Sequence, residues 1–400
     1  MELNIERMAL LLLTAAVVSM LGRKLRLPYT VGLTLTGVAL ALSPLSVNIG
    51  LTKSLIYTAF LPPLIFEATL QIPWKELRRN LLVILVLATL GVLLATGVTA
   101  AGMRLLVGWP WETALLLGVL LAATDPVSVI ATFKEAGVEG RLRLLVEAES
   151  LFNDGTAAVL FGVALAAIGG GDLSAAGVAQ SFLMTVFGGV VCGAMVGGAA
   201  LFLAGRTDDH LIEITFTLVA AYGSFLLAEH FHLSGVLATL TAGLLVGNYG
   251  LCGTLTEKGR AEVISFWDYI TFVVNSLIFL LIGIRLAHHS FTVMLLPALA
   301  AVALSLAGRA FAVYGCCALF ARSRRKVTAA HQHILFWGGL RGALALALVL
   351  GLPASLPQRE TLVTVTFAVV AFSIIAQGMT ITPLLRRLGE IQPEPEGNAP

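Results

Sequence analysis

Charged residues are scarce in this chain. Asp, Glu, Lys and Arg make up 12% of its 400 residues, whereas 58% of the residues are apolar. A soluble globular domain carries about 25% charged residues, so the shortage excludes a soluble enzyme and a disordered chain. The formal net charge is only +2, so a nucleic acid or another polyanion is not an expected partner. The composition indicates an integral membrane protein whose surroundings are the lipid bilayer.

Cysteine is also scarce. The four cysteines lie in apolar stretches and show neither a CxxC pair nor the Cys/His spacing of a metal site; they are Cys192, Cys252, Cys316 and Cys317. His331 and His333 are two residues apart, a spacing that does not direct both rings to one face of a helix. We expect no disulfide framework, no transition-metal site and no cofactor.

Long polar connections are absent as well, so there is no room between the apolar runs for a nucleotide-binding or catalytic soluble domain. The energy for any transport would then come from an ion gradient. We expect one transmembrane domain over 1–388 and a short Pro/Glu-rich cytoplasmic tail over 389–400.

Apolar runs of about 17 to 25 residues are long enough to cross the hydrocarbon core as helices. The sequence therefore predicts an all-α polytopic membrane protein with about 13 transmembrane helices. Their expected ranges are 6–22, 29–46, 51–70, 81–106, 112–133, 142–168, 175–204, 210–230, 233–249, 264–286, 291–320, 331–351 and 361–385.

The distribution of Lys and Arg supports this number of crossings. If the connection after the first run is cytoplasmic, the connections on that side hold 18 Lys and Arg residues and those on the other side hold 5. Cytoplasmic loops carry the excess of Lys and Arg in membrane proteins. The sequence thus predicts an N-terminus outside and a C-terminus in the cytoplasm.

Thirteen crossings can be divided into six, one and six. Copies displaced by seven crossings enter the membrane in opposite directions, which is the inverted-repeat arrangement of secondary transporters. We expect repeats over approximately 1–170 and 210–388, with a linker helix over approximately 175–204.

The segment over 112–133 contains an acid in its middle, within the string AATDPVSV. Pro126 disfavours helical geometry at Asp125 and removes a backbone donor, so the helix is expected to open and to free carbonyls such as that of Thr124. Such a break is tolerated only where it is buried in protein or lines a cavity. Asp125 is expected either to bind a cation or to act only as a local helix cap.

The segment over 142–168 carries more acids in one helix. Three ionised side chains, Asp125, Glu149 and Asp154, would together cost about 8 to 10 kcal/mol in the membrane if unpaired. They must therefore be protonated, paired or bound to a cation. Ser150 and Asp154 are four residues apart and share one stripe of the helix, so both can offer oxygens to one ion.

Arg341, in the string GGLRGALALAL, brings a permanent positive charge into the membrane. We predict that it forms a structural ion pair with Glu149 and leaves Asp154 free to titrate. Gly338, Gly339 and Gly342 favour unwinding of this segment. Arg309 is expected to be structural.

Glu67 follows a Pro-Pro break in LPPLIFEATL. Its position leaves two interpretations open, a supporting acid beside the ion site or an interfacial residue near Lys75.

Together these strings resemble the sodium/hydrogen exchanger family of cation:proton antiporters, of the bacterial NhaP type. They are LPPLIFEATL, AATDPVSVIATF, ESLFNDGTAAVLF, LSGVLATLTAGLLVGN and GGLRGALALAL, and they occur in the family's order over 61–348. The resemblance implies an NhaA-like fold with broken crossing helices, a homodimer and a place in the bacterial inner membrane.

The same resemblance implies roles for individual residues. Asp154 would carry the cation and the proton, and Thr124, Asp125 and Ser150 would complete the site beside Asn153. Glu67 matches an acid that contributes through water, and Glu149 with Arg341 matches the family's ion pair between helices.

The expected activity is exchange of Na⁺, or of Li⁺ or K⁺, for H⁺, for pH and sodium homeostasis. An amide at Asn153 does not titrate, which favours electroneutral 1:1 exchange. A K⁺/H⁺ antiporter of the same fold remains an alternative. A gated cation channel is less favoured because the polar residues gather at one depth, and an intramembrane protease because its aspartate or serine motifs are missing.

Overall fold

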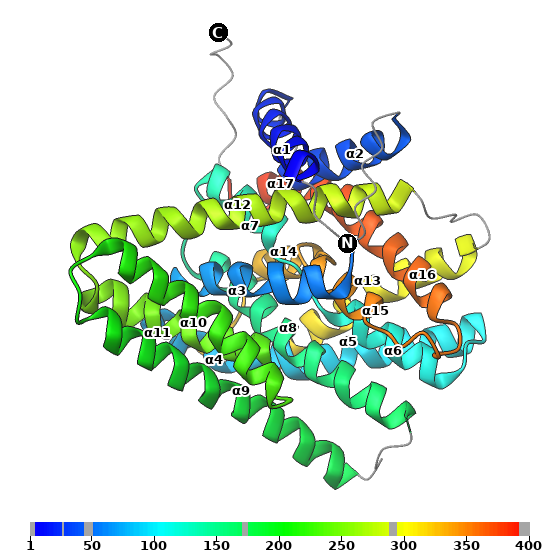
Figure 1. The fold of residues 1–400 in the computed structure, drawn as a ribbon. Coiled ribbons are helices and arrows are strands. Elements are labelled where there is room, and N and C mark those ends of the chain that lie inside the picture. The colour runs from blue at the N-terminus through cyan, green and yellow to red at the C-terminus, as the bar shows by residue number, and fades with distance from the viewer. Residues whose placement is uncertain (1–4, 26–27, 44–50, 170–174, 288–293, 392–400) are drawn as a thin grey trace.

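The computed structural model describes residues 5–25, 28–43, 51–169, 175–287 and 294–391 (Figure 1). Within these ranges the chain is helical, and its one extended pairing is a bridge between Asp125 and Leu340. Most of the predicted tail, residues 392–400, lies outside the described residues.

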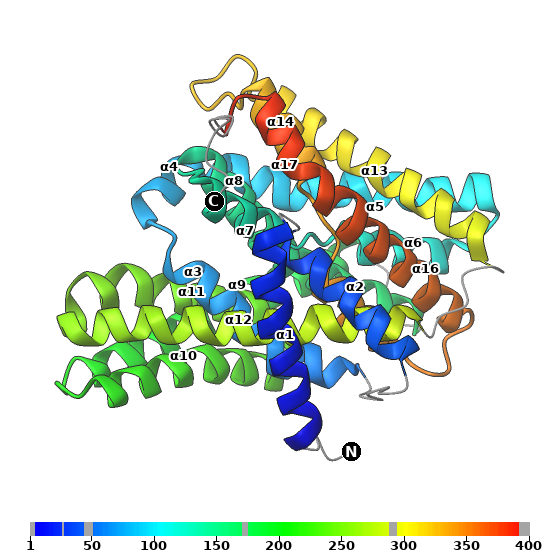
Figure 2. The ribbon, with the colours of Figure 1, turned by 90° about the horizontal axis from the view of Figure 1, so that it is seen from above.

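One group of helices forms a first bundle around the long helix α12. Helices α9, α10 and α11 pack against one another below α12 in Figure 1, and α1 and α2 cross α12 in the view from above (Figure 2). Its members are α1 (Ile5–Leu25), α2 (Tyr29–Leu42), α3 (Leu61–Leu70), α9 (Ala175–Ala204), α10 (His210–His230), α11 (Gly235–Leu245) and α12 (Glu257–Ala287).

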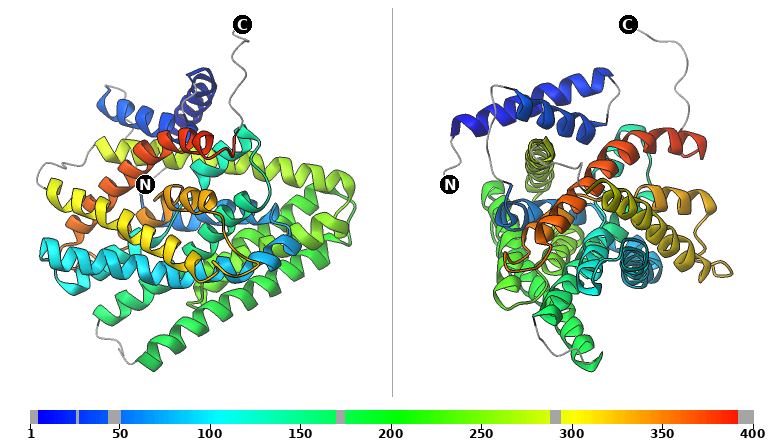
Figure 3. Two further views of the ribbon diagram at one scale, coloured as in Figure 1. Left: turned by 180° about the vertical axis from the view of Figure 1, so that it is seen from behind. Right: turned by 90° about the vertical axis from the view of Figure 1, so that its right-hand side faces the viewer.

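A second group packs around α13 and α5, and Figure 3 shows it from two further sides. Its members are α4 (Trp74–Val86), α5 (Val92–Gly102), α6 (Trp111–Ala122), α13 (Leu295–Ala318), α14 (Ala329–Trp337), α15 (Ala343–Leu350), α16 (Arg359–Phe372) and α17 (Gly378–Arg387). Helix α8 (Arg141–Ile168) contacts α4 and α6 in this group and α9 and α11 in the first. It therefore connects the two bundles.

Seven helical stretches of the described chain are long and apolar enough to cross a membrane. They are Trp74–Val107, Arg141–Ile168, Ala176–Ala204, His210–His230, Glu257–Ala287, Leu295–Ala318 and Arg359–Arg387. π-Helical turns such as Leu87–Gly91 and Ser373–Gln377 continue the first and the last of these without interruption. Shorter apolar helices accompany them at Met8–Gly22, Tyr29–Leu42, Leu55–Leu70, Trp111–Ala122 and Gly235–Leu251.

The prediction of an all-helical membrane protein is confirmed, and helix occurs in every predicted range. The starts of two helices were placed about seven residues too late: α4 begins at Trp74 rather than near residue 81, and α12 begins at Glu257 rather than near residue 264. The first two turns of α4 show why. They are amphipathic: Leu77 is buried, whereas Lys75, Arg78 and Arg79 are exposed. A search for continuous apolar runs passes over such turns.

Two of the predicted segments are broken, as the sequence indicated. The segment over 112–133 divides into α6 and α7 (Val127–Ala136), and the segment over 331–351 divides into α14 and α15. The two breaks lie against each other, since the Asp125 backbone N–H donates to the Leu340 carbonyl over 2.7 Å. A Cβ at Gly342 would collide with the Asp125 carboxylate, so a residue without a side chain permits this close approach.

Candidate ion-binding site

Asp125 lies in the first break, between α6 and α7. Its Oδ1 accepts a hydrogen bond from the Val127 N–H over 2.9 Å, and its Oδ2 accepts one from the Ala343 N–H over 3.4 Å. These donors are the first residues of α7 and α15, so one carboxylate caps two half-helices. The positive ends of both helix dipoles favour its ionised form. Asp125 is thus a helix cap, and it also faces a cavity.

Thr124 joins the break to α8. Its Oγ1 lies 3.0 Å from the Oγ of Ser150, and both residues are buried. Ser150 therefore reaches the break through Thr124, and Thr124 itself lines the cavity.

Asp154 lies one turn further along α8 and is 8% exposed. Its Oδ1 is buried and has no hydrogen-bond partner in the described part of the chain. An unpaired carboxylate oxygen is costly in such surroundings unless it is protonated or bound to a cation.

A cavity of about 360 Å³ brings the two aspartates together. Its wall includes Asp125, Asp154 and Thr124, and it extends to Glu67 on α3. Asn153 does not line it, because its Nδ2 donates to the Glu149 Oε1 over 3.2 Å. Sequence reasoning placed Asn153 beside the ion, whereas its amide turns toward Glu149.

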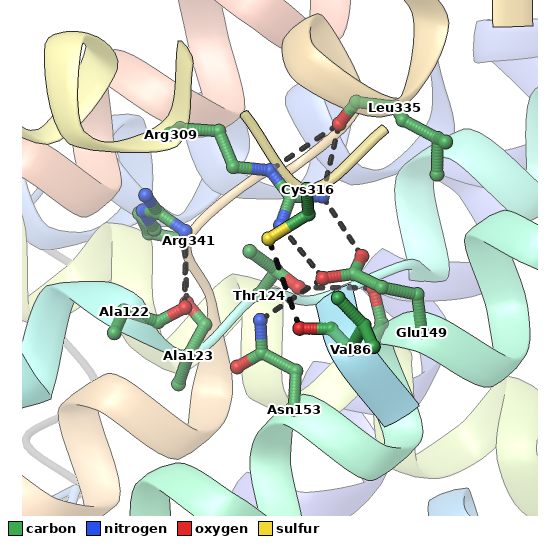
Figure 4. A network of polar contacts seen from close by, with 11 residues as sticks. Val86, Ala122, Ala123, Thr124, Glu149, Asn153, Arg309, Cys316, Leu335 and Arg341 are labelled. Atoms are coloured by element: carbon green, nitrogen blue, oxygen red, sulfur yellow. Dashed lines mark hydrogen bonds and ion pairs between the residues drawn. The ribbon is translucent and has the colours of Figure 1, made fainter. Parts of the chain in front are cut away.

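The predicted ion pair between Glu149 and Arg341 is wrong: the partner of Glu149 is Arg309 on α13. The Arg309 guanidinium meets the carboxylate through two hydrogen bonds, NH1 to Oε1 over 2.7 Å and NH2 to Oε2 over 2.8 Å (Figure 4). NH2 also donates to the Leu335 carbonyl over 2.9 Å. A Cβ on Gly339 would press against the Arg309 guanidinium, so the glycine makes room for it.

Arg341 instead binds backbone carbonyls at the end of α6, so it does not pair with Glu149. Its NH1 lies 3.4 Å from the Ala122 carbonyl and 3.3 Å from the Ala123 carbonyl (Figure 4). These carbonyls come at the end of α6, where the break removes their helical donors. A cation there also complements the negative end of the helix dipole. Arg341 therefore caps the C-terminal end of α6 at the break.

Two residues that sequence reasoning missed hold the second break in place. The Ser373 Oγ accepts from the Arg341 backbone N–H over 2.8 Å and donates to the Gln377 Oε1 over 2.7 Å. The Gln377 Nε2 donates in turn to the Trp337 carbonyl, the last of α14, over 2.9 Å. A signal was present: Ser373 and Gln377 are polar, four residues apart and within an otherwise apolar run.

Glu67 lies in the wall of the cavity, as the interpretation of a supporting acid expects. Its Oε1 accepts from the Gln71 Nε2 over 2.9 Å and lies 3.5 Å from the Nζ of Lys134. The same Nζ lies 3.9 Å from Asp268 on α12. Lys134 and Asp268 were not identified from the sequence: Lys134 is a charge near a helix end, where charges are common, and Asp268 lies within α12 with no motif around it.

Among the described residues, no group of three or more His, Cys, Asp or Glu side chains is arranged to hold a metal ion. The oxygens gathered at the breaks are instead the carboxylates and hydroxyls that suit a hard monovalent cation.

Comparisons with known proteins agree with this geometry. The family model described as "Sodium/hydrogen exchanger, transmembrane" matches residues 10–387. The chain is 37% identical to the Na⁺/H⁺ antiporter ApNhaP of Aphanothece halophytica, over 92% of this chain and 70% of that protein. It is 36% identical to the Na⁺/H⁺ antiporter NhaP of Pseudomonas aeruginosa, over 85% of this chain and 82% of that protein.

A solved structure has the same fold. The sodium proton antiporter MjNhaP1 of Methanocaldococcus jannaschii superimposes with a TM-score of 0.73 at 20% identity, over 96% of this chain and 98% of that one.

Proposed function

Because this chain belongs to the sodium/hydrogen exchanger family and exchanges Na⁺ for H⁺, we propose that Asp154 is the carboxylate on which the two ions alternate. The observation that carries the proposal is the unpaired, buried Oδ1 of Asp154 in the cavity at the two breaks. Burial disfavours the charged form of a carboxyl group, and a nearby cation restores it. A proton and a Na⁺ ion therefore compete for one group.

Asp125, Thr124 and Ser150 support the exchange at Asp154. Asp125 is fixed by two helix N-termini, whose dipoles favour its charged form, and it attracts the cation toward Asp154. The hydroxyls of Thr124 and Ser150 lie at hydrogen-bonding distance from each other, and Thr124 offers an oxygen at the cavity. Glu67 contributes from further along the wall.

We further propose electroneutral 1:1 exchange. Glu149 is neutralised by Arg309, and Asn153 is an amide, so neither changes its charge when Asp154 does. One titrating carboxylate exchanges one proton for one monovalent cation. Na⁺ is the proposed cation, with Li⁺ or K⁺ as alternatives.

The proposed topology has thirteen crossings: two inverted six-helix repeats joined by one linker helix. The two broken segments are displaced by seven predicted crossings and meet in antiparallel fashion, which supports the repeat. The Lys/Arg bias supports an outer N-terminus and a cytoplasmic C-terminus in the bacterial inner membrane. The homodimer rests on family resemblance, and the mass of the purified protein in detergent tests it.

Proteoliposomes test the proposed site. Proton flux is measured with Na⁺, Li⁺, K⁺ and Rb⁺ added one at a time. Asp154→Asn should lose the flux for every cation, whereas the matched control Asp208→Asn, an exposed acid away from the cavity, should keep it. Na⁺-driven proton flux from Asp154→Asn would overturn the assignment.

The same vesicles test the stoichiometry. A potential imposed with valinomycin and K⁺ should leave the Na⁺-driven proton flux unchanged, once K⁺ at those concentrations is shown not to enter the site. A clear acceleration would mean that a second group, such as Asp125 or Glu67, also changes protonation.

A further inference from the structure

Lys134 brings a positive charge into the wall of the cavity that contains Asp154. It stands in the last turn of α7, the half-helix that Asp125 caps, and its Nζ lies 3.5 Å from Glu67 and 3.9 Å from Asp268. The Lys134 and Asp268 side chains are 44% and 50% exposed, whereas Asp154 is 8% exposed. The cavity thus leads from an accessible mouth to a buried end.

The ammonium group of Lys134 resembles the cargo chemically. It is a compact monovalent cation, and the oxygens it approaches are carboxylate oxygens that also attract Na⁺. The neighbouring groups supply no second cation to Glu67. Arg143 lies 3.8 Å from Glu147, which also lines the cavity, and Gln71 contributes only a neutral amide to Glu67.

The contacts of Lys134 also join separate parts of the fold. Lys134 belongs to the broken segment, whereas Glu67 stands on α3 and Asp268 on α12, both in the first bundle. From Val127 to Lys134 the helix rises by only about 10 Å. At that separation the electrostatic influence of one charge on a partly buried site changes occupancy several-fold.

We propose that Lys134 is a tethered competitor of Na⁺, which occupies the carboxylates of Glu67 and Asp268 at the mouth and thereby sets the apparent Na⁺ affinity from that face. The inference rests on the proposed exchange at Asp154. An entering Na⁺ ion displaces the ammonium group from Glu67, and the ammonium returns when the ion has left.

The test is the apparent KM for Na⁺ in oriented proteoliposomes, with Na⁺ supplied at each face in turn. Lys134→Gln should lower the KM about threefold to tenfold at the face where Lys134 lies and leave it unchanged at the other. Lys134→Arg, which keeps the charge, should remain close to wild type. Asp268→Asn should raise the KM at the same face, because the change leaves Lys134 on Glu67 and removes a negative charge that attracts Na⁺.

Lys258→Gln is the matched control, since Lys258 is exposed near the start of α12 and does not line the cavity. It should leave the KM unchanged. The proposal is overturned if Lys134→Gln leaves the KM unchanged or raises it, if Lys258→Gln lowers it equally, or if both faces respond alike. These failures are distinct from a failure of the proposed function, which is measured by the loss or survival of flux in Asp154→Asn.

Discussion

Glu149 and Asp154 make an instructive comparison, because both are acids on α8 and both are almost completely buried. Glu149 is held by two hydrogen bonds from Arg309, while Asn153 donates a third. Asp154 keeps an oxygen that no described group satisfies, and it faces a cavity. The difference shows that burial alone does not make a carboxylate functional in a membrane. What matters is whether the fold has already provided its counter-charge.

The comparison predicts that the largest loss of stability follows removal of the partner of Glu149. Arg309→Ala should lower the free energy of unfolding by about 3 to 5 kcal/mol, because it leaves Glu149 buried without a counter-charge. Thermal unfolding in detergent measures this loss. The double variant with Glu149→Gln should recover part of it, and a single variant as stable as wild type would show that the pair contributes nothing.

Asp125→Asn should have the next largest effect and should act mainly on transport. The amide can still accept one hydrogen bond from a half-helix, but it lacks the charge that faces the two helix N-termini and the cation. Na⁺-driven flux should fall at least about tenfold, with a loss of stability of about 1 to 2 kcal/mol. Unchanged Na⁺ affinity would reduce Asp125 to a cap alone.

Gln377→Ala should weaken the second break. It removes the donor to the Trp337 carbonyl and the acceptor for the Ser373 hydroxyl, which should cost about 1 to 3 kcal/mol. Since Gln377 does not line the cavity, the maximal flux should fall more than the KM for Na⁺ changes. Flux measured over a Na⁺ series separates the two, and a change confined to KM would contradict this positioning role.

Ser150→Ala should give the smallest effect. It removes the hydroxyl partner of Thr124, a loss of about 1 kcal/mol, and Thr124 keeps its place at the cavity. The KM for Na⁺ should rise about fivefold or less. Thr156→Ala, a buried threonine two residues beyond Asp154, is the control and should leave the KM unchanged. If Ser150→Ala abolished the flux, its hydroxyl would be a direct and indispensable ligand.

These predictions rest on a site that the sequence revealed only in part. Apolar run length indicated the helices, and the combination of Asp125 with Pro126 indicated the first break, because those constraints act between neighbouring residues. The position of Asp154 on the Ser150 stripe likewise followed from helical spacing. Such local rules reach across one helix and no further.

The choice between two arginines could not be made in that way. Arg309 and Arg341 are equally able to pair with Glu149, and the deciding groups are backbone carbonyls of Ala122 and Ala123, which carry no signature in the sequence. Those carbonyls engage Arg341 only because the two breaks meet in space. Lys134 and Asp268 were missed for a related reason: they come from α7 and α12, and only the fold brings them to one cavity.

The central claim is that Asp154 exchanges its proton for the cation while Glu149 does not. The most direct measurement is the number of protons released when Na⁺ is added to the purified protein in weakly buffered detergent solution. Wild type should release one proton for each Na⁺ bound, Glu149→Gln should release the same number, and Asp154→Asn should release none. Proton release from Asp154→Asn, or two protons for each Na⁺ in wild type, would contradict the account.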